Sequence, residues 1–153
     1  MSLTVYSFGA FYYPHLPILE PRMRIAAIYE SSPLLFWVII VIATGRAILP
    51  SFQESYEPLK EPFLRRFQCE ILSAPLPLQT VQAITYLTLF PQPILTQAND
   101  PSWLQSAVAV NAAMYMGLHR AKPTQSLRSI GVSSGSAHAR AHTWLGCFVA
   151  STA

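Results

Sequence analysis

Two histidines near the end of the chain have the clearest chemical spacing. His138 and His142 are four residues apart, so a helix would place both imidazoles on one face, where they could bind a divalent metal ion. The zinc-protease pattern adds a carboxylate to such a pair, and none accompanies it here. We therefore expect two solvated or capping histidines and no metal-binding residue.

The other reactive residues lack partners in the sequence. His119 stands beside Arg120 at the end of a predicted helix, with no Ser, Cys or carboxylate motif nearby to supply a nucleophile or an orienting group. Cys69 and Cys147 form no metal-spaced or redox pair, which favours buried free thiols in a reducing compartment. We expect no catalytic or cofactor-binding residue. A helical enzyme using His119 or the two later histidines is an alternative, although no reaction class presents itself.

Composition limits the classes of partner. The chain of 153 residues is 52% hydrophobic and only 11% charged, which is well below the charge content of an ordinary soluble domain. Its ten basic residues are spread along the chain and form no dense patch, so we expect no DNA-binding residue in it. Such a low charge content favours a piece of a larger body, a surface that meets a partner, or a membrane protein.

The elements that must position these residues are helices. The strongest prediction covers 100–120, where Asp100 is a good N-cap and an apolar stripe recurs every three or four residues. We expect this stripe to face the core and the helix to be covered on most sides. Its members are Trp103, Ala107, Val110, Met114 and Leu118.

A second apolar stretch begins at Pro33. The run over 34–43 is ten residues long, whereas a membrane span needs about 20, so the sequence favours a buried core helix. A small membrane-associated protein anchored by 34–43 is the alternative from another class.

The remaining segments complete an all-α prediction. We expect a polar interval over 50–62, a surface helix over 63–72, a helix over 78–90 capped by Thr80, and a final helix from residue 139. The three tryptophans are expected to pack between helices: Trp37, Trp103 and Trp144. Residues 1–13 have no clear assignment, and the Ser- and Gly-rich stretch 123–137 predicts a mobile loop.

Five strings in a fixed order carry a resemblance. They are YYPHLPILEP (12–21), SSPLLFWVIIVIATGR (31–46), PLQTVQAITYLTLFP (77–91), DPSWLQSAVAVNAAMYMGLHRA (100–121) and ARAHTWLGCFVAST (139–152). Together they resemble the regulatory middle-homology domain of fungal zinc-cluster transcription factors. The matching positions are 15–19, 33–37, 80–87, 116–120 and 140–148. Residues 14–153 would form part of this domain.

The resemblance implies an all-α irregular helical bundle, an incomplete portion of a larger helical domain, in a nuclear regulator of transcription by RNA polymerase II. The family binds DNA through an N-terminal cluster of six cysteines holding two zinc ions. This chain has two cysteines, so zinc and DNA contact are implied only for a missing N-terminal domain. Expected partners are a second copy and the transcription machinery. A small effector is unidentified, and no membrane is expected.

Overall fold

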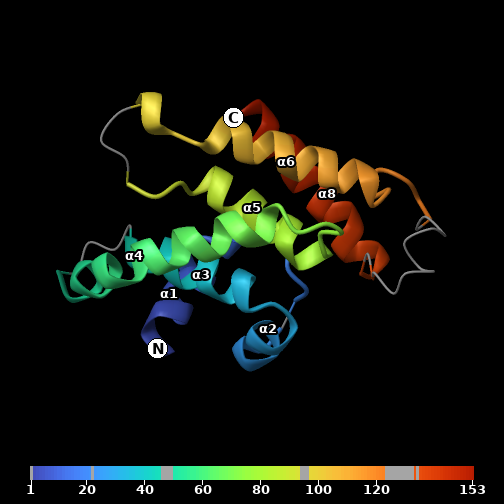
Figure 1. The fold of residues 1–153 in the computed structure, drawn as a ribbon. Helices are drawn as coiled ribbons and strands as arrows, with labels where there is room; N and C mark the ends of the chain where they lie inside the picture. The colour runs from blue at the N-terminus through green and yellow to red at the C-terminus, as the bar shows by residue number, and fades with distance from the viewer. Residues whose placement is uncertain (1, 22, 46–49, 94–96, 123–132, 134) are drawn as a thin grey trace.

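The computed structural model describes residues 2–21, 23–45, 50–93, 97–122, 133 and 135–153, and in these residues it contains helices and no strand. The prediction of an all-α fold is confirmed. Seven α-helices and two short 3-10 helices are described (Figure 1): α1 Ser2–Phe11, η1 Tyr13–His15, α2 Ile25–Ser31, α3 Pro33–Gly45, α4 Pro50–Ile71, α5 Leu78–Leu89, η2 Gln97–Asn99, α6 Ser102–Tyr115 and α8 Ala137–Thr152.

Two layers meet at α5. Helices α6 and α8 lie along one side of α5, and α3 and α4 contact it from the other (Figure 1). Helices α1, α2 and α4 surround α3, so α3 is covered on every side and buries residues 34–36 and 38–44. The prediction of a core helix at 34–43 is confirmed. No helix in the described ranges is long and apolar enough to cross a membrane.

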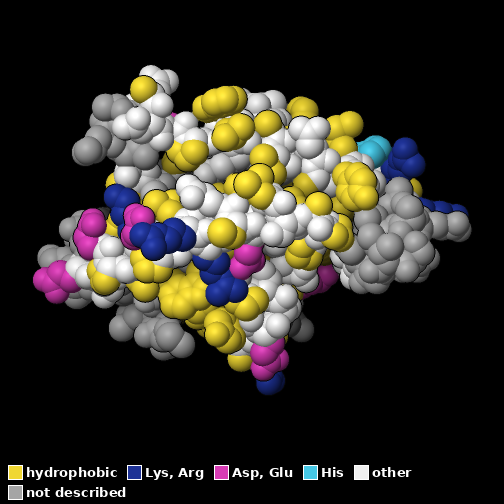
Figure 2. Space-filling model, in the orientation of Figure 1, with side chains coloured by type: hydrophobic (Ala, Val, Ile, Leu, Met, Phe, Trp, Pro, Cys, Tyr) yellow, Lys and Arg dark blue, Asp and Glu magenta, His cyan; other side chains and the backbone are white. Residues whose placement is uncertain are grey.

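The buried face of α6 differs from the prediction. The side chains buried on α6 are Gln105, Ala109 and Ala113, whereas Trp103 is 74% exposed and Met114 is 52% exposed. Alanines let the backbones of α5 and α8 approach closely, so the small-residue face packs inward and the larger apolar side chains remain outside. Figure 2 shows hydrophobic side chains along the upper edge of the molecule, where α6 lies in Figure 1.

The two ends of α6 are fixed by local hydrogen bonds. Asp100 accepts from the backbone N–H of Ser102 at 2.9 Å, as an N-terminal cap would. The helix ends at Tyr115, five residues before the predicted end, because Gly117 takes a positive φ of 67°. Gly117 donates to the carbonyl of Met114 and Leu118 donates to that of Ala113, both at 2.9 Å, which is a Schellman motif.

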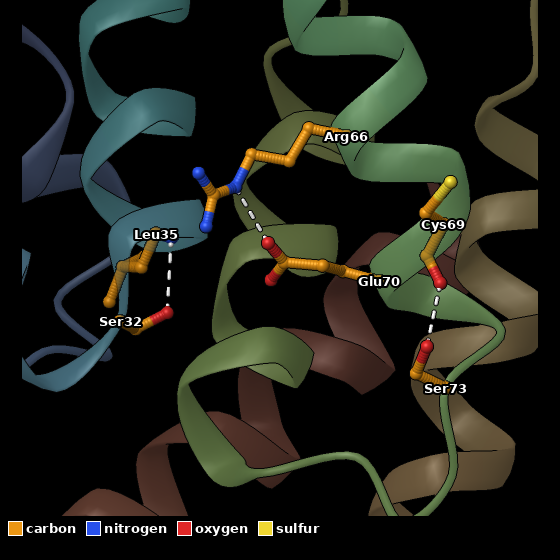
Figure 3. Close-up of polar contacts among 6 residues, drawn as sticks. All are labelled: Ser32, Leu35, Arg66, Cys69, Glu70 and Ser73. Atoms are coloured by element: carbon orange, nitrogen blue, oxygen red, sulfur yellow. Dashed lines mark hydrogen bonds and ion pairs between the residues drawn. The ribbon is translucent and has the colours of Figure 1, made fainter.

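The predicted start of the surface helix at residue 63, after the polar interval 50–62, is wrong, because α4 runs unbroken from Pro50 to Ile71 with Pro58 and Pro62 inside it. Tyr56, Phe63 and Phe67 are seven and four residues apart and all buried, so the packed face holds the helix together despite the prolines. The outer side of α4 carries ion pairs at helical spacing, such as Arg66 to Glu70 at 2.6 Å (Figure 3).

Other predictions meet mixed outcomes. Residues left unassigned at the N-terminus form α1. Thr80 is not the cap of α5: it lies buried inside the helix, which starts after Pro77. Trp103 is exposed, so it does not pack in the core, whereas Trp37 and Trp144 are half-buried against it. The loop predicted at 123–137 lies largely outside the described residues.

The two cysteines differ in exposure, which corrects the expectation that both are buried. Cys69 is exposed on α4 (Figure 3), and Cys147 is fully buried on α8. Burial raises the pKa of the Cys147 thiol, which lowers its thiolate fraction at any given pH. We predict that iodoacetamide alkylates Cys69 at least about a hundredfold faster than Cys147 in the native protein. Mass spectrometry of timed samples measures both rates, and urea should abolish the difference; equal native rates would contradict the fold of α8.

Candidate functional site

Four of the five strings singled out in the sequence meet at one place in the fold. Residues 15–19, 80–87, 116–120 and 140–148 come together around α5, and we call this region the motif junction. Five polar side chains within it are almost fully buried, and the hydrogen bonds of the last four define its geometry: Thr80, Gln82, Thr85, Arg140 and Thr143.

Gln82 joins three parts of the chain. Its Nε2 donates to the carbonyl of Ile18 at 2.9 Å and to Oγ1 of Thr143 on α8 at 3.0 Å. One turn later, the hydroxyl of Tyr86 donates to the carbonyl of Leu16 at 2.6 Å. Burial, followed by the effect of Tyr13, raises the pKa of Tyr86, so the phenol remains a donor. Helix α5 therefore holds the proline-flanked segment 15–19 through two side-chain donors.

Helix α8 meets the same segment at a glycine. A Cβ added at Gly146 would lie 2.9 Å from Cγ2 of Ile18 and 3.3 Å from Cδ1 of Leu16. Next to it, the Cys147 sulfur lies 3.4 Å from Oγ1 of Thr85. The close approach of α8 to residues 16 and 18 thus depends on a missing side chain.

We predict that Gly146→Ala destabilises the protein by about 1 kcal/mol. The overpacking cost of about 1–3 kcal/mol exceeds the gain in helix propensity of about 1 kcal/mol. Thermal unfolding followed by circular dichroism should show a Tm about 2–4 °C lower. Gly9→Ala on α1 is the matched control, because nothing lies within 4 Å of its added Cβ, and it should be stabilising. A Gly146→Ala variant as stable as the control would contradict the close approach.

Arg140 ties the start of α8 to the end of α6. Its Nη2 donates to the carbonyl of Gly117 at 2.8 Å and to that of Arg120 at 2.9 Å, and the residue is only 3% exposed. Burial lowers the pKa of this guanidinium. The rings of His119 and Trp144 lie beside this contact, with centroids 5.6 Å apart. The strings ending at Arg120 and beginning at Arg140 therefore form one structural unit.

The histidines weighed for chemistry lie in two places. The rings of His138 and His142 are brought together on α8 with centroids 3.8 Å apart, as their spacing predicts. His119 is separate from them, exposed and packed against Trp144. Within the described part of the chain, no three His, Cys, Asp or Glu side chains gather as a metal site.

The residues do not fit a zinc cluster. Such a cluster needs six cysteine thiolates, and the chain has one exposed cysteine on α4 and one buried on α8. No chemical step through zinc is therefore assigned to this chain.

Exposed apolar side chains lie on the two helices next to the motif junction. Helix α8 runs antiparallel to α6, because Arg140 contacts the end of α6 while the Cys147 sulfur lies 3.9 Å from the carbonyl of Ala109 in its middle. Both helices carry large apolar side chains that are about half or more exposed. We call the exposed apolar sides of these two helices together the outer α6–α8 face, defined by Trp103, Leu104, Met114, Tyr115, Leu145, Phe148 and Val149.

The sequence reasoning missed both features for identifiable reasons. The alanines spaced by four at 109 and 113 are compatible with a close-packed face of α6, but the larger apolar side chains around the helix make that face ambiguous in the sequence. Gln82 stands alone among apolar neighbours on α5, and such an isolated polar residue is a signal of a buried hydrogen bond.

The fold and the motif junction define an all-α domain of the kind implied by the sequence resemblance. The model of the fungal specific transcription factor domain matches residues 5–152. The chain therefore belongs to the fungal specific transcription factor domain family.

A curated relative agrees with this assignment. The chain is 28% identical over 109 residues to the transcriptional regulatory protein SEF1 of Candida albicans. The matched segment covers 70% of this chain and 11% of that relative, so the chain corresponds to a small part of its length. No solved structure matches the chain.

Proposed function

We propose that this chain is the regulatory domain of a nuclear, zinc-cluster type regulator of transcription by RNA polymerase II, and that it acts through protein contacts. The match of the family model over residues 5–152 carries the proposal. The matched relative is named a transcriptional regulatory protein, which supports the same role. The family assignment favours this role over a membrane anchor at 34–43 and over a helical enzyme.

In this proposal, protein partners bind the outer α6–α8 face. Exposed apolar patches of a few hundred Å² mark interaction sites on proteins, and this face carries Trp103 and Phe148, which are 74% and 59% exposed. Contact with DNA would be made by a separate zinc-cluster domain, and this chain would need no metal or cofactor of its own. A second copy and the transcription machinery are the proposed partners.

The mechanism is a shift between two populations. In one state the outer α6–α8 face covers an activation region, and in the other that region is free. A partner or small effector that binds one state more tightly changes the fraction of molecules that activate. Because Arg140 fixes α8 to α6, the two helices would present the face as one body.

A tethered reporter tests the proposal. The chain is inserted between a heterologous DNA-binding domain and an activation domain, and reporter output is compared with the same fusion lacking the chain. We expect reporter output to fall about fivefold or more. A fivefold change corresponds to about 1 kcal/mol, which is the lower end of typical coupling free energies between two sites. The double variant Trp103→Gln, Phe148→Gln should restore it, whereas Arg65→Ala on the exposed side of α4 should not.

The same variants separate function from folding. Because Trp103 and Phe148 are largely exposed, each glutamine substitution should change the free energy of unfolding by less than about 0.5 kcal/mol. Urea unfolding of the isolated chain measures this. An unchanged reporter with the wild-type chain, at equal expression, would contradict the proposed role.

A further inference from the structure

A small cavity lies on the opposite layer from the outer α6–α8 face. It has a volume of about 180 Å³ and lies between α1, the segment that follows α1, α2 and α3. Its inner wall is apolar and buried, formed by Phe8, Ile28, Phe36 and Ile39. Its rim includes Gly9 and the half-buried Glu20. Leu19 also lines the cavity, so the cavity adjoins the motif junction at the segment 15–19.

We propose that this cavity binds a small aromatic or alkyl primary amine, with the apolar body against the inner wall and the ammonium group at Glu20. An apolar cavity of about 150 Å³ holds a molecule the size of benzene, so this one has room for a single ring and a short arm. Binding of the amine does not depend on the transcriptional role proposed above. It would make the domain a small-molecule binding domain as well.

The charge at the rim sets the ligand class. Among the described residues that line the cavity, Glu20 carries the charge, and its carboxylate attracts a cation and disfavours an anion. Its Oε1 accepts a hydrogen bond from the hydroxyl of Ser136. A carboxylate has about four acceptor positions on its two oxygens, so an ammonium group can bind beside the serine.

The same carboxylate connects the cavity to α8. Ser136 caps α8 by accepting from the backbone N–H of Ala139 at 3.1 Å, while its own hydroxyl donates to Glu20. An amine bound at Glu20 would therefore use the same carboxylate that accepts the hydrogen bond from Ser136, the N-cap residue of α8. Arg140, one turn along, joins that helix to α6.

Direct binding to the full 153-residue chain tests the proposal, with benzylamine as the probe. Benzyl alcohol and benzoate are its neutral and anionic counterparts of similar size. Thermal shift and ligand-detected NMR should show that benzylamine binds and raises Tm with concentration, that benzyl alcohol binds about tenfold more weakly, and that benzoate does not bind.

Two pairs of variants locate the site. Gly9 lines the cavity and nothing lies within 4 Å of a Cβ added there, so the longer side chain of Gly9→Leu should occupy the cavity and abolish binding, whereas Tyr6→Leu, at a 75% exposed position of α1, should not. Glu20→Gln should make benzylamine bind no better than benzyl alcohol. Glu30→Gln, an exposed carboxylate on α2 that does not line the cavity, should retain the preference.

One measurement needs no substitution. In the wild-type protein, NMR contacts should join the benzylamine ring to the side chains of Phe8 and Phe36. The proposal is overturned if the folded wild-type chain binds no benzylamine at millimolar concentration, if benzoate binds equally well, or if Gly9→Leu folds and binds as before. Ring contacts confined to residues outside the cavity, such as Leu72 or Tyr115, would overturn it as well.

Discussion

Arg140→Ala is expected to lower the free energy of unfolding by about 3 kcal/mol, which corresponds to a fall in Tm of about 6–12 °C. The substitution removes the donor for two backbone carbonyls, those of Gly117 and Arg120, from a position that is 3% exposed. Hydrogen bonds from charged donors contribute about 1.5–3 kcal/mol each, and the two carbonyls lose this donor, although that of Gly117 still accepts from the backbone N–H of Arg120 at 3.0 Å. Urea unfolding followed by circular dichroism measures the change.

Two further variants define the cause. Arg140→Lys should recover less than half of the loss, because an ammonium group lacks the planar fork of a guanidinium. Arg65→Ala is the matched control, since Arg65 pairs with Glu61 at 3.4 Å on the exposed side of α4, and it should cost no more than about 0.5 kcal/mol. Equal losses at positions 140 and 65 would show that the contact between α8 and the end of α6 does not stabilise the fold.

Gln82→Leu is expected to cost about 2–3 kcal/mol. Leucine is close to glutamine in size but donates no hydrogen bond, so the carbonyl of Ile18 and the hydroxyl of Thr143 lose their contact with Nε2 at positions that are 2% and 0% exposed. A buried polar group left without a partner costs about 1–3 kcal/mol. Urea unfolding measures the effect, and Gln68→Leu, at an exposed position of α4, should change stability by less than about 0.5 kcal/mol.

A double-mutant cycle shows whether Gln82 and Thr143 act together. Thr143→Val removes the hydroxyl that receives one of the two hydrogen bonds. In the Gln82→Leu background it should cost less than alone, with a coupling of about 1 kcal/mol, because the partner is already lost. Strictly additive losses would mean that the two side chains stabilise the fold through separate contacts.

Elements with a strong local signal could be predicted from the sequence. The run that starts at Ser32 and Pro33 gave α3, and Ser32 does accept from the backbone N–H of Leu35 at 3.2 Å (Figure 3). The existence of α6 was also predictable from Asp100 and the apolar periodicity. Its orientation was not, because apolar side chains surround that helix and only packing against α5 and α8 selects the alanine face.

Longer-range features could not be predicted. The contacts of Gln82 join residues 61 and 64 positions apart in the chain, and nothing local specifies such a pair. Arg140 was read only as one of several scattered basic residues and as part of a resembling string. The course of α4 through Pro58 and Pro62 was missed because proline is an unfavourable helix residue, and tertiary packing of the aromatic face outweighs that preference.

The acceptors in the motif junction have a consequence for how such sequences diverge. Tyr86 donates to a main-chain carbonyl, Gln82 donates to one carbonyl and one hydroxyl, and Arg140 donates to the carbonyls of Gly117 and Arg120. A carbonyl is present whatever the side chain, so these hydrogen bonds constrain the donor side chain and place no constraint on the side chain of the accepting residue. Pairs of columns in an alignment of this family should therefore covary weakly at these strong contacts. Methods that infer contacts from correlated substitutions would underestimate the junction that holds the domain together.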